Sequence, residues 1–148
     1  MNRVMFPLFA GLGAATAIAV LALSQVELTD IALLMAPFGA TTVLVFGVPD
    51  SPLAQPKNVI VGHMLTALIG VIFSQYVGTT PWSLAAATGL AVSAMLLTKT
   101  THPPAGANPL LIMLTGQSWG FLLTPVLFGA VVIVLIGKTM RKLQRQWG

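Results

Sequence analysis

An internal repeat restricts the folds open to this chain more than any other feature of its sequence. The stretch 37–41 (PFGAT) returns 67 positions later as 104–108 (PAGAN). The same separation relates two pairs of glycines, Gly62 with Gly129 and Gly70 with Gly137. Elsewhere the spacing drifts by a few residues, so we infer an old duplication with small changes in the loops. Membrane transporters are often assembled from two related halves, with the substrate site between them.

The chain is too apolar for a soluble domain. Hydrophobic residues make up 56% of its 148 residues and charged residues only 7%, and its mean hydropathy is +0.92, whereas soluble domains carry about 25% charged residues. Six apolar stretches follow one another: 4–24, 31–48, 59–77, 82–98, 103–115 and 120–137. A full membrane crossing takes about 20 helical residues.

Four of these stretches are predicted to cross the membrane completely. The second is interrupted by Pro37 and Gly39, and the fifth is short and rich in proline, so both are predicted to be broken or re-entrant. The expected fold is an all-α membrane protein with a two-fold internal repeat, four full transmembrane helices and two short broken segments, although six crossings are possible. Within a single membrane domain 1–148, the halves cover about 4–77 and 82–138, and 139–148 forms a basic cytoplasmic tail.

The basic residues predict where the two ends lie. Four of the seven Lys and Arg residues follow residue 137, and basic segments stay cytoplasmic, so both termini are predicted to be cytoplasmic. Six crossings would also place Lys57 and Lys99 on the cytoplasmic side and would invert the halves relative to each other. Four crossings would place both lysines outside and would make the halves parallel. The sequence leaves these alternatives open.

Thr41 and Asn108 occupy the same position in the two copies of the repeat. Both residue types accept hydrogen bonds at the start of a helix, and Pro109 after Asn108 is favoured at the first helical position. We therefore predict that Thr41 and Asn108 cap two short helices, 42–46 and 109–115. Small residues precede each cap and allow a ligand or another backbone to approach closely. They are Gly39, Ala40, Gly106 and Ala107.

Charge favours an anion as the substrate. A helix N-terminus carries about half a positive charge, so two such ends brought together would suit an anion. The only acidic residues are Glu27, Asp30 and Asp50. All three are predicted to lie between the apolar stretches, so no carboxylate is available within the membrane for a cation. We expect a small inorganic anion to bind at residues 39–41 and 106–108.

Two histidines and three residues near segment ends complete the candidate site. His102 precedes two prolines, which exclude it from a helix interior, and His63 lies in the third stretch, where a polar group is costly. Both are predicted to give the substrate a hydrogen bond or a proton; a surface loop for His102 and packing against a polar group for His63 remain alternatives. Lys57, Asn58 and Lys99 are predicted to line an entrance that attracts anions, unless the lysines extend to the lipid headgroups.

The sequence lacks the signatures of an enzyme. It has no cysteine, and therefore no disulfide or thiolate metal site, and no paired carboxylates, GxSxG elbow or phosphate-binding loop. We expect no catalytic activity, no cofactor and no metal. The expected partners are the anion, the lipid bilayer and, because the chain is small, further copies in a dimer or trimer, with no nucleic acid.

Two regions resemble those of a known family. The segment 101–107 (THPPAGA) resembles the signature of the HPP family of integral membrane proteins, named for its His-Pro-Pro motif. The segments 36–40 (APFGA) and 51–58 (SPLAQPKN), with Gly62-His63, are similar to its other well-marked region. The resemblance covers about residues 5–138. The characteristic positions that it singles out are Asn58, His63, His102, Pro103, Pro104 and Gly106.

The resemblance implies a small protein with four membrane helices, in a family whose members in cyanobacteria and chloroplasts are associated with nitrite transport. Nitrite is a small monovalent anion, in agreement with a site free of acids. We therefore expect a transporter or channel for a small inorganic anion, with nitrite as the best single candidate, in the inner membrane of a bacterial cell. The alternative is an integral membrane scaffold, or a subunit of a larger complex, that transports nothing itself.

Overall fold

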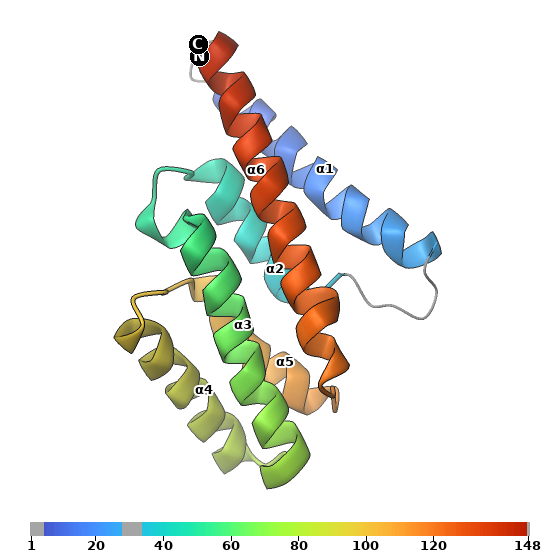
Figure 1. The fold of residues 1–148 in the computed structure, drawn as a ribbon, viewed down its shortest axis with the longest axis vertical. Helices are drawn as coiled ribbons and strands as arrows, with labels where there is room; N and C mark the ends of the chain where they lie inside the picture. Colours follow the sequence, from blue (N-terminus) through green and yellow to red (C-terminus); the bar gives the residue numbers. More distant parts are fainter. Residues whose placement is uncertain (1–4, 28–33, 148) are drawn as a thin grey trace.

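A computed structural model describes residues 5–27 and 34–147, which form six α-helices joined by short turns (Figure 1). The helices are α1 (Met5–Glu27), α2 (Ala36–Thr42), α3 (Pro56–Ile72), α4 (Pro81–Leu97), α5 (Asn108–Leu114) and α6 (Phe128–Trp147). Wider π-helical turns adjoin α2, α3 and α6 at Val43–Gly47, Phe73–Val77 and Leu122–Leu127, and 3₁₀ turns lie at Pro52–Ala54 and Pro103–Ala107. These two ranges contain no strand, so the all-α prediction is confirmed.

Three helical stretches are long and apolar enough to cross a membrane. They are Met5–Ser24, Pro56–Val77 and Leu122–Gln146, with 20, 22 and 25 residues. The fourth predicted span is the 17-residue helix α4, about 26 Å long at 1.5 Å per residue, against about 30 Å for the bilayer core. The structure therefore supports three candidate spans, and a complete crossing by α4 stays a prediction.

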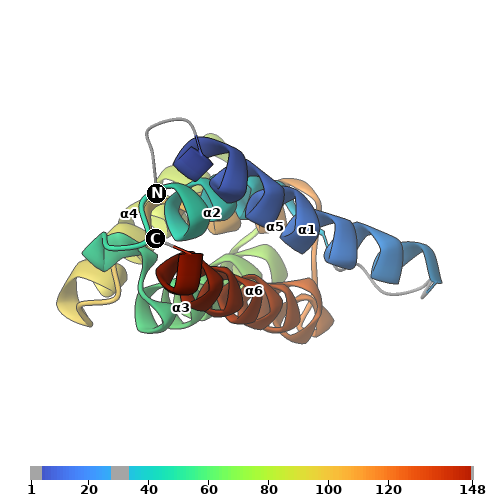
Figure 2. The ribbon, with the colours of Figure 1, turned by 90° about the horizontal axis from the view of Figure 1, so that it is seen from above.

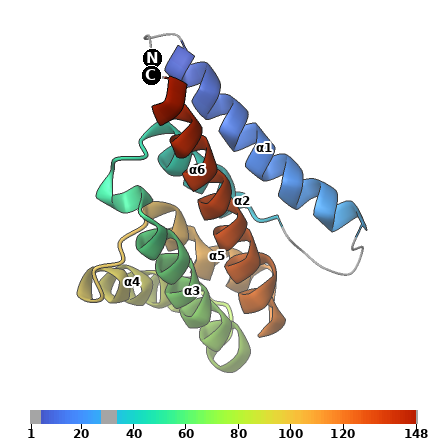
Figure 3. The same ribbon diagram turned by 45° about the horizontal axis from the view of Figure 1, so that its top comes forward.

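Successive helices alternate in direction along the long axis of the molecule (Figure 1). Helices α1, α3 and α5 run away from the end at which α1 begins, and α2, α4 and α6 run back toward it. Helix α3 contacts α4, α5 and α6, whereas α1 lies at the outside against α2 and α6 (Figures 2 and 3). Because each half contributes three alternating helices, the second half runs opposite to the first.

The two short segments begin earlier than predicted. Helix α2 starts at Ala36, with Pro37 in its first turn, where proline is favoured, so Thr41 lies in the last turn of α2. The second segment starts at Pro103 with a 3₁₀ turn, and α5 begins at Asn108 itself, without a side-chain cap. Neither Thr41 nor Asn108 caps a helix, so the predicted N-cap role is wrong for both. The N-terminus of α2 lies five residues before Thr41, whereas that of α5 is at Asn108, so the predicted pairing of two helix starts at these residues is wrong for α2.

Glycines on α3 and α6 let each half pack closely on the short segment of the other. A side-chain carbon added at Gly70 would lie 2.9 Å from Pro109 Cα and 3.2 Å from Ile112 Cβ, and one added at Gly137 would overlap Val45. Gly70 and Gly137 are 67 residues apart, as are Val45 and Ile112. The two contacts are therefore equivalent within the repeat and interlock its halves, while the proposed boundaries of the halves stay a prediction.

Candidate functional site

Thr41 lies between two histidines in the interior of the molecule. Its Oγ1 is 2.8 Å from Nε2 of His63, on α3, and 3.0 Å from Nε2 of His102, which precedes the Pro103–Ala107 turn. The two imidazole rings meet edge to face with their centres 5.0 Å apart. The ring of Phe38 also packs edge to face on His63, at 5.4 Å. All four side chains are completely buried.

Asn108, the repeat equivalent of Thr41, also contacts His63. Its amide nitrogen Nδ2 lies 3.1 Å from His63 Nδ1, 3.1 Å from the His63 carbonyl oxygen and 3.0 Å from Thr66 Oγ1. Equivalent residues of the two short segments therefore meet on one side chain of α3. The structure brings four predicted site residues into one hydrogen-bonded group, termed here the histidine cluster: Thr41, His63, His102 and Asn108.

The loop that carries His102 is held against the start of α3. His102 Nδ1 is 2.7 Å from the carbonyl oxygen of Leu53, and Asn58 Nδ2 donates to the carbonyl oxygen of Thr101 at 2.9 Å. Gly62 permits this approach, because a side-chain carbon there would lie 3.0 Å from His102 Cβ and 2.9 Å from a backbone oxygen of the loop. Asn58, predicted at an entrance, therefore holds the His102 loop in place.

The small residues of the predicted site lie outside the histidine cluster. Gly39, Ala40 and Ala107 are exposed, and Gly106 is half-buried. A side-chain carbon added at Gly39 or Gly106 would meet no atom within 4 Å. The close approach expected at these residues is therefore not made by any part of the chain that the structure describes.

The two lysines predicted at an entrance are exposed near the His102 loop. Lys57 lies in the first turn of α3 and Lys99 follows the end of α4. The hydrogen bonds from Asn58 and His102 described above bring these two chain segments together. Both lysines are therefore placed where they can attract an anion, and this role stays a prediction.

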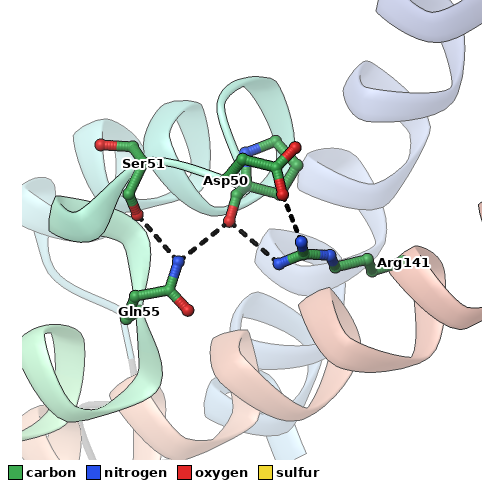
Figure 4. Close-up of polar contacts among 5 residues, drawn as sticks. Asp50, Ser51, Gln55 and Arg141 are labelled. Atoms are coloured by element: carbon green, nitrogen blue, oxygen red, sulfur yellow. Dashed lines mark hydrogen bonds and ion pairs between the residues drawn. The ribbon is translucent and has the colours of Figure 1, made fainter.

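Asp50 lies in the exposed loop before α3 and forms an ion pair with Arg141 of α6 (Figure 4). Arg141 also donates to the carbonyl oxygen of Pro49 at 3.2 Å, and Gln55 donates to the carbonyl oxygens of Pro49 and Ser51 at 3.2 and 2.9 Å. These bonds tie the loop to the basic end of α6. The carboxylate of Asp50 is therefore paired with Arg141 at the surface. This agrees with the prediction that Asp50 lies between the apolar stretches.

Within the described residues, the histidine cluster contains no carboxylate. Glu27 ends α1, but its side chain and the whole of Asp30 lie outside the described part of the chain. No group of three or more His, Asp or Glu side chains that could hold a metal occurs in residues 5–27 and 34–147. The cluster consists of hydroxyl, amide and imidazole groups, which donate hydrogen bonds to anions and, in the case of imidazole, accept protons.

Sequence reasoning does not identify Thr66 or Leu53 as parts of the site. Thr66 has a detectable signal, because it follows His63 by three residues and side chains with this spacing share one face of a helix. Leu53 acts through its backbone oxygen, so no property of its side chain reveals it. Contacts made by a backbone carbonyl, such as that of Leu53, depend on tertiary structure alone.

Comparison with known proteins assigns the chain to a family. A family model described as "HPP, transmembrane region" matches residues 2–148. Two transmembrane proteins of Dictyostelium discoideum are each 36% identical to the chain over 121 residues, which is 76% of this chain and 42% and 39% of theirs, so the chain spans about two fifths of the length of these relatives. No solved structure matches it significantly. The match includes the His-Pro-Pro triplet that begins inside the histidine cluster, and the chain belongs to the HPP family of integral membrane proteins.

Proposed function

We propose that this chain is a transporter or channel for a small inorganic anion, with nitrite as the leading candidate, and that the anion binds at the histidine cluster. The observation that carries the proposal is the meeting of Thr41 and Asn108, equivalent residues of two interrupted segments, on His63 in the interior. Membrane transporters place substrate sites where interrupted segments of opposed halves meet. Buried polar groups are costly between apolar helices, and such groups mark substrate pathways.

The chemistry of the cluster suits a small oxyanion. The hydroxyl of Thr41, the imidazole of His63 and the amide of Asn108 all donate hydrogen bonds. The two amide hydrogens of Asn108 face three acceptors. One hydrogen can therefore form a hydrogen bond to a ligand while the other keeps an acceptor within the protein. An anion that enters exchanges internal hydrogen bonds for bonds to its own oxygens, which keeps the buried polar groups satisfied.

Flux through the purified protein in liposomes tests the proposal. Nitrite, nitrate, formate and chloride are compared, and we expect nitrite flux to exceed that of the other anions. Asn108→Ala should raise the half-saturating nitrite concentration by about tenfold, because a lost hydrogen bond to a charged ligand is worth roughly 1.4 kcal/mol or more.

The matched control is Gln75→Ala, which removes an exposed amide that donates to the carbonyl oxygen of Gln117 at 3.2 Å. This variant should keep the half-saturating concentration of the wild type. Folded protein that conducts none of the four anions would contradict the proposed function.

A non-transporting scaffold is the second candidate, and one observation favours it. The side chains of the histidine cluster contact one another directly, as polar groups do in a purely structural core. A scaffold predicts that Asn108→Ala lowers thermal stability with no transport to lose. Constant copurification with one partner protein, together with no flux in liposomes, would support the scaffold.

A further inference from the structure

The hydrogen bonds around the two imidazoles fix where each neutral ring carries its hydrogen. His102 Nδ1 faces the carbonyl oxygen of Leu53 at 2.7 Å, and a carbonyl only accepts, so His102 carries its hydrogen on Nδ1. His63 Nδ1 faces the amide nitrogen of Asn108 at 3.1 Å, and that nitrogen only donates, so His63 carries its hydrogen on Nε2. A flipped Asn108 amide would set its oxygen against the His63 carbonyl oxygen, which confirms the orientation.

Thr41 connects these two rings in one direction. Its oxygen accepts from Nε2–H of His63 at 2.8 Å, and its own hydrogen can be donated to the bare Nε2 of His102 at 3.0 Å. The same hydroxyl can donate to the carbonyl oxygen of Pro37 at 3.1 Å. A threonine hydroxyl has one hydrogen and accepts two hydrogen bonds. The hydrogen of Thr41 therefore has two acceptors within reach, His102 and Pro37.

We propose that Nε2 of His102 binds one proton that moves together with the anion, and that the Thr41 hydroxyl turns from His102 to Pro37 when this proton binds. The proposal rests on the proposed function for its anion. In the protonated state both Nε2–H groups donate to Thr41, whose hydrogen goes to the Pro37 carbonyl, so every one of these groups stays paired. His63 is excluded as the proton acceptor, because its second N–H would meet the N–H of Asn108.

No unpaired acidic side chain of the described residues faces His102, so the anion is the group that can balance the charge of the bound proton. The described elements packed on the His102 loop are α2, α3, α4, α5 and the Pro52–Ala54 turn, whose Leu53 carbonyl binds His102. Helices α2, α4 and α5 carry no titratable side chain, and α3 contributes His63 and the exposed Lys57, neither of which is an acid. The loop before the turn carries Asp50, but its exposed carboxylate is paired with Arg141. The proton and the anion therefore favour each other's binding, and this coupling is reciprocal.

Asn108 supplies a second, independent sign of a proton-bearing substrate. Its Oδ1 is buried and has no hydrogen-bond partner within the part of the chain that the structure describes. Buried acceptors are almost always paired. The protonated form of a weak acid such as nitrous acid can donate to this oxygen as it enters, whereas a bare anion cannot. When the acid's O–H bond breaks and its proton binds Nε2 of His102, the anion is left in the cluster, so the anion and the proton are taken up as a pair.

Nitrogen NMR of the two histidines tests the proton site without any transport. The chain has only two histidines, so ¹⁵N-histidine labelling in nanodiscs gives two imidazoles, which His63→Gln assigns. At high pH we expect opposite tautomers, Nε2–H for His63 and Nδ1–H for His102. On acidification His102 should gain its second hydrogen first, and nitrite should move this midpoint upward by about one pH unit, a tenfold coupling. Identical tautomers, or His63 protonating first, would overturn the proposal.

Proton flux in liposomes tests the coupling. Wild-type protein should carry one proton with each nitrite, without net current, and Thr41→Val should lower coupled uptake by about tenfold. Thr41→Ser keeps the hydroxyl and should restore it. Thr88→Val is the matched control, because Thr88 makes the same bond to the carbonyl four residues earlier, at 2.8 Å, on α4. Nitrite flux without proton movement would overturn this inference alone, whereas the expected tautomers without any flux would overturn the proposed function.

Discussion

Lys99 follows the end of α4 in a backbone conformation that lysine rarely adopts. Its φ is 54°, and the following amide, of Thr100, donates to the carbonyl oxygen of Met95 at 2.9 Å and closes the helix end. This left-handed conformation costs most residues roughly 1–2 kcal/mol, whereas glycine and asparagine adopt it readily. The backbone gains nothing from a lysine at this position, and the role of its charge at an anion entrance stays a prediction.

Replacement of Lys99 by asparagine separates charge from backbone conformation. Lys99→Asn should leave thermal stability unchanged or slightly higher, because asparagine tolerates a positive φ. It should raise the half-saturating nitrite concentration at low ionic strength and lose this effect at high salt, where charges are screened. Lys142→Asn, an exposed lysine near the end of α6, is the control. An effect of Lys99→Asn that is independent of salt would contradict attraction by its charge.

At the scale of elements, the two short segments are equivalent in sequence but differ in their first turns. The stretch 36–47 begins as an α-helix and ends in a π-helical turn, whereas 103–114 begins as a 3₁₀ turn and ends as an α-helix. The second segment contains Pro103, Pro104 and Pro109, which lack the N–H that an α-helical bond requires. The two equivalent segments therefore differ in backbone conformation, although residues 41 and 108 both contact His63.

The existence of these segments is predictable from sequence, but their starts are not predicted correctly. Glycine near the end of each segment and proline within it indicate a short, interrupted element. Gly116 indeed follows α5 with a φ of 62°. The N-cap preference of threonine and asparagine misleads, because Pro37 moves the helix start to Ala36. A proline in the first turn determines the helix start more strongly than a cap residue does. Proline has no backbone N–H, whereas a cap residue only provides an acceptor for one.

The glycine contacts between halves predict a specific pair of variants. Gly137→Ala should destabilise the protein by about 1–3 kcal/mol, as overpacked cores do, because the new methyl group overlaps Val45. Val45→Ala should recover much of this loss in the double variant. Thermal unfolding of the purified protein in detergent measures both effects.

Gly89→Ala provides the control for the glycine contacts. No atom lies within 4 Å of a side-chain carbon added at Gly89 on α4, and alanine is favoured over glycine in helices by about 1 kcal/mol. This variant should therefore be as stable as the wild type or more stable. Equal destabilisation by Gly89→Ala and Gly137→Ala would contradict the packing argument.

At the scale of the whole molecule, hydrogen bonds identify which loops share an end. The Asp50–Arg141 ion pair joins the loop before α3 to the last third of α6, so Lys57 lies toward the same end as the basic tail. Away from this contact, Thr79 donates to the carbonyl oxygen of Met113 at 3.0 Å and joins the loop between α3 and α4 to the last turn of α5. This arrangement and the alternating helix directions favour six segments and inverted halves, and cytoplasmic termini stay a prediction from the basic residues.

Labelling of single cysteines tests this topology, and the natural chain has none to remove. Lys57→Cys and Gln146→Cys should react with an impermeant maleimide only after the inner membrane is opened. Ser118→Cys, in the exposed turn after α5, should react in intact spheroplasts. Labelling of Lys57→Cys from outside would instead require four crossings and parallel halves.

Composition and the lengths of the apolar stretches predict the class of this protein, and the repeat predicts which residues are related. The hydrophobic fraction requires a membrane helix bundle, and the shared position of Thr41 and Asn108 points to one site. The partners of that site are not predictable in the same way. His63 is predicted as a site residue, but Leu53 reaches the cluster through the turn before α3, whose packing depends on glycines such as Gly62 that carry no chemical signal.

The repeat is broken at the residue that both short segments contact. Position 130 is equivalent to position 63, but it carries alanine where the first half has histidine. In a carrier, the halves are expected to exchange roles between a state open to one side of the membrane and a state open to the other. Because only one half carries the histidine, the imidazole makes different contacts in the two states, and the free energies of these states differ. If the chain is a carrier, we therefore expect import and export of the same solute to saturate at different concentrations.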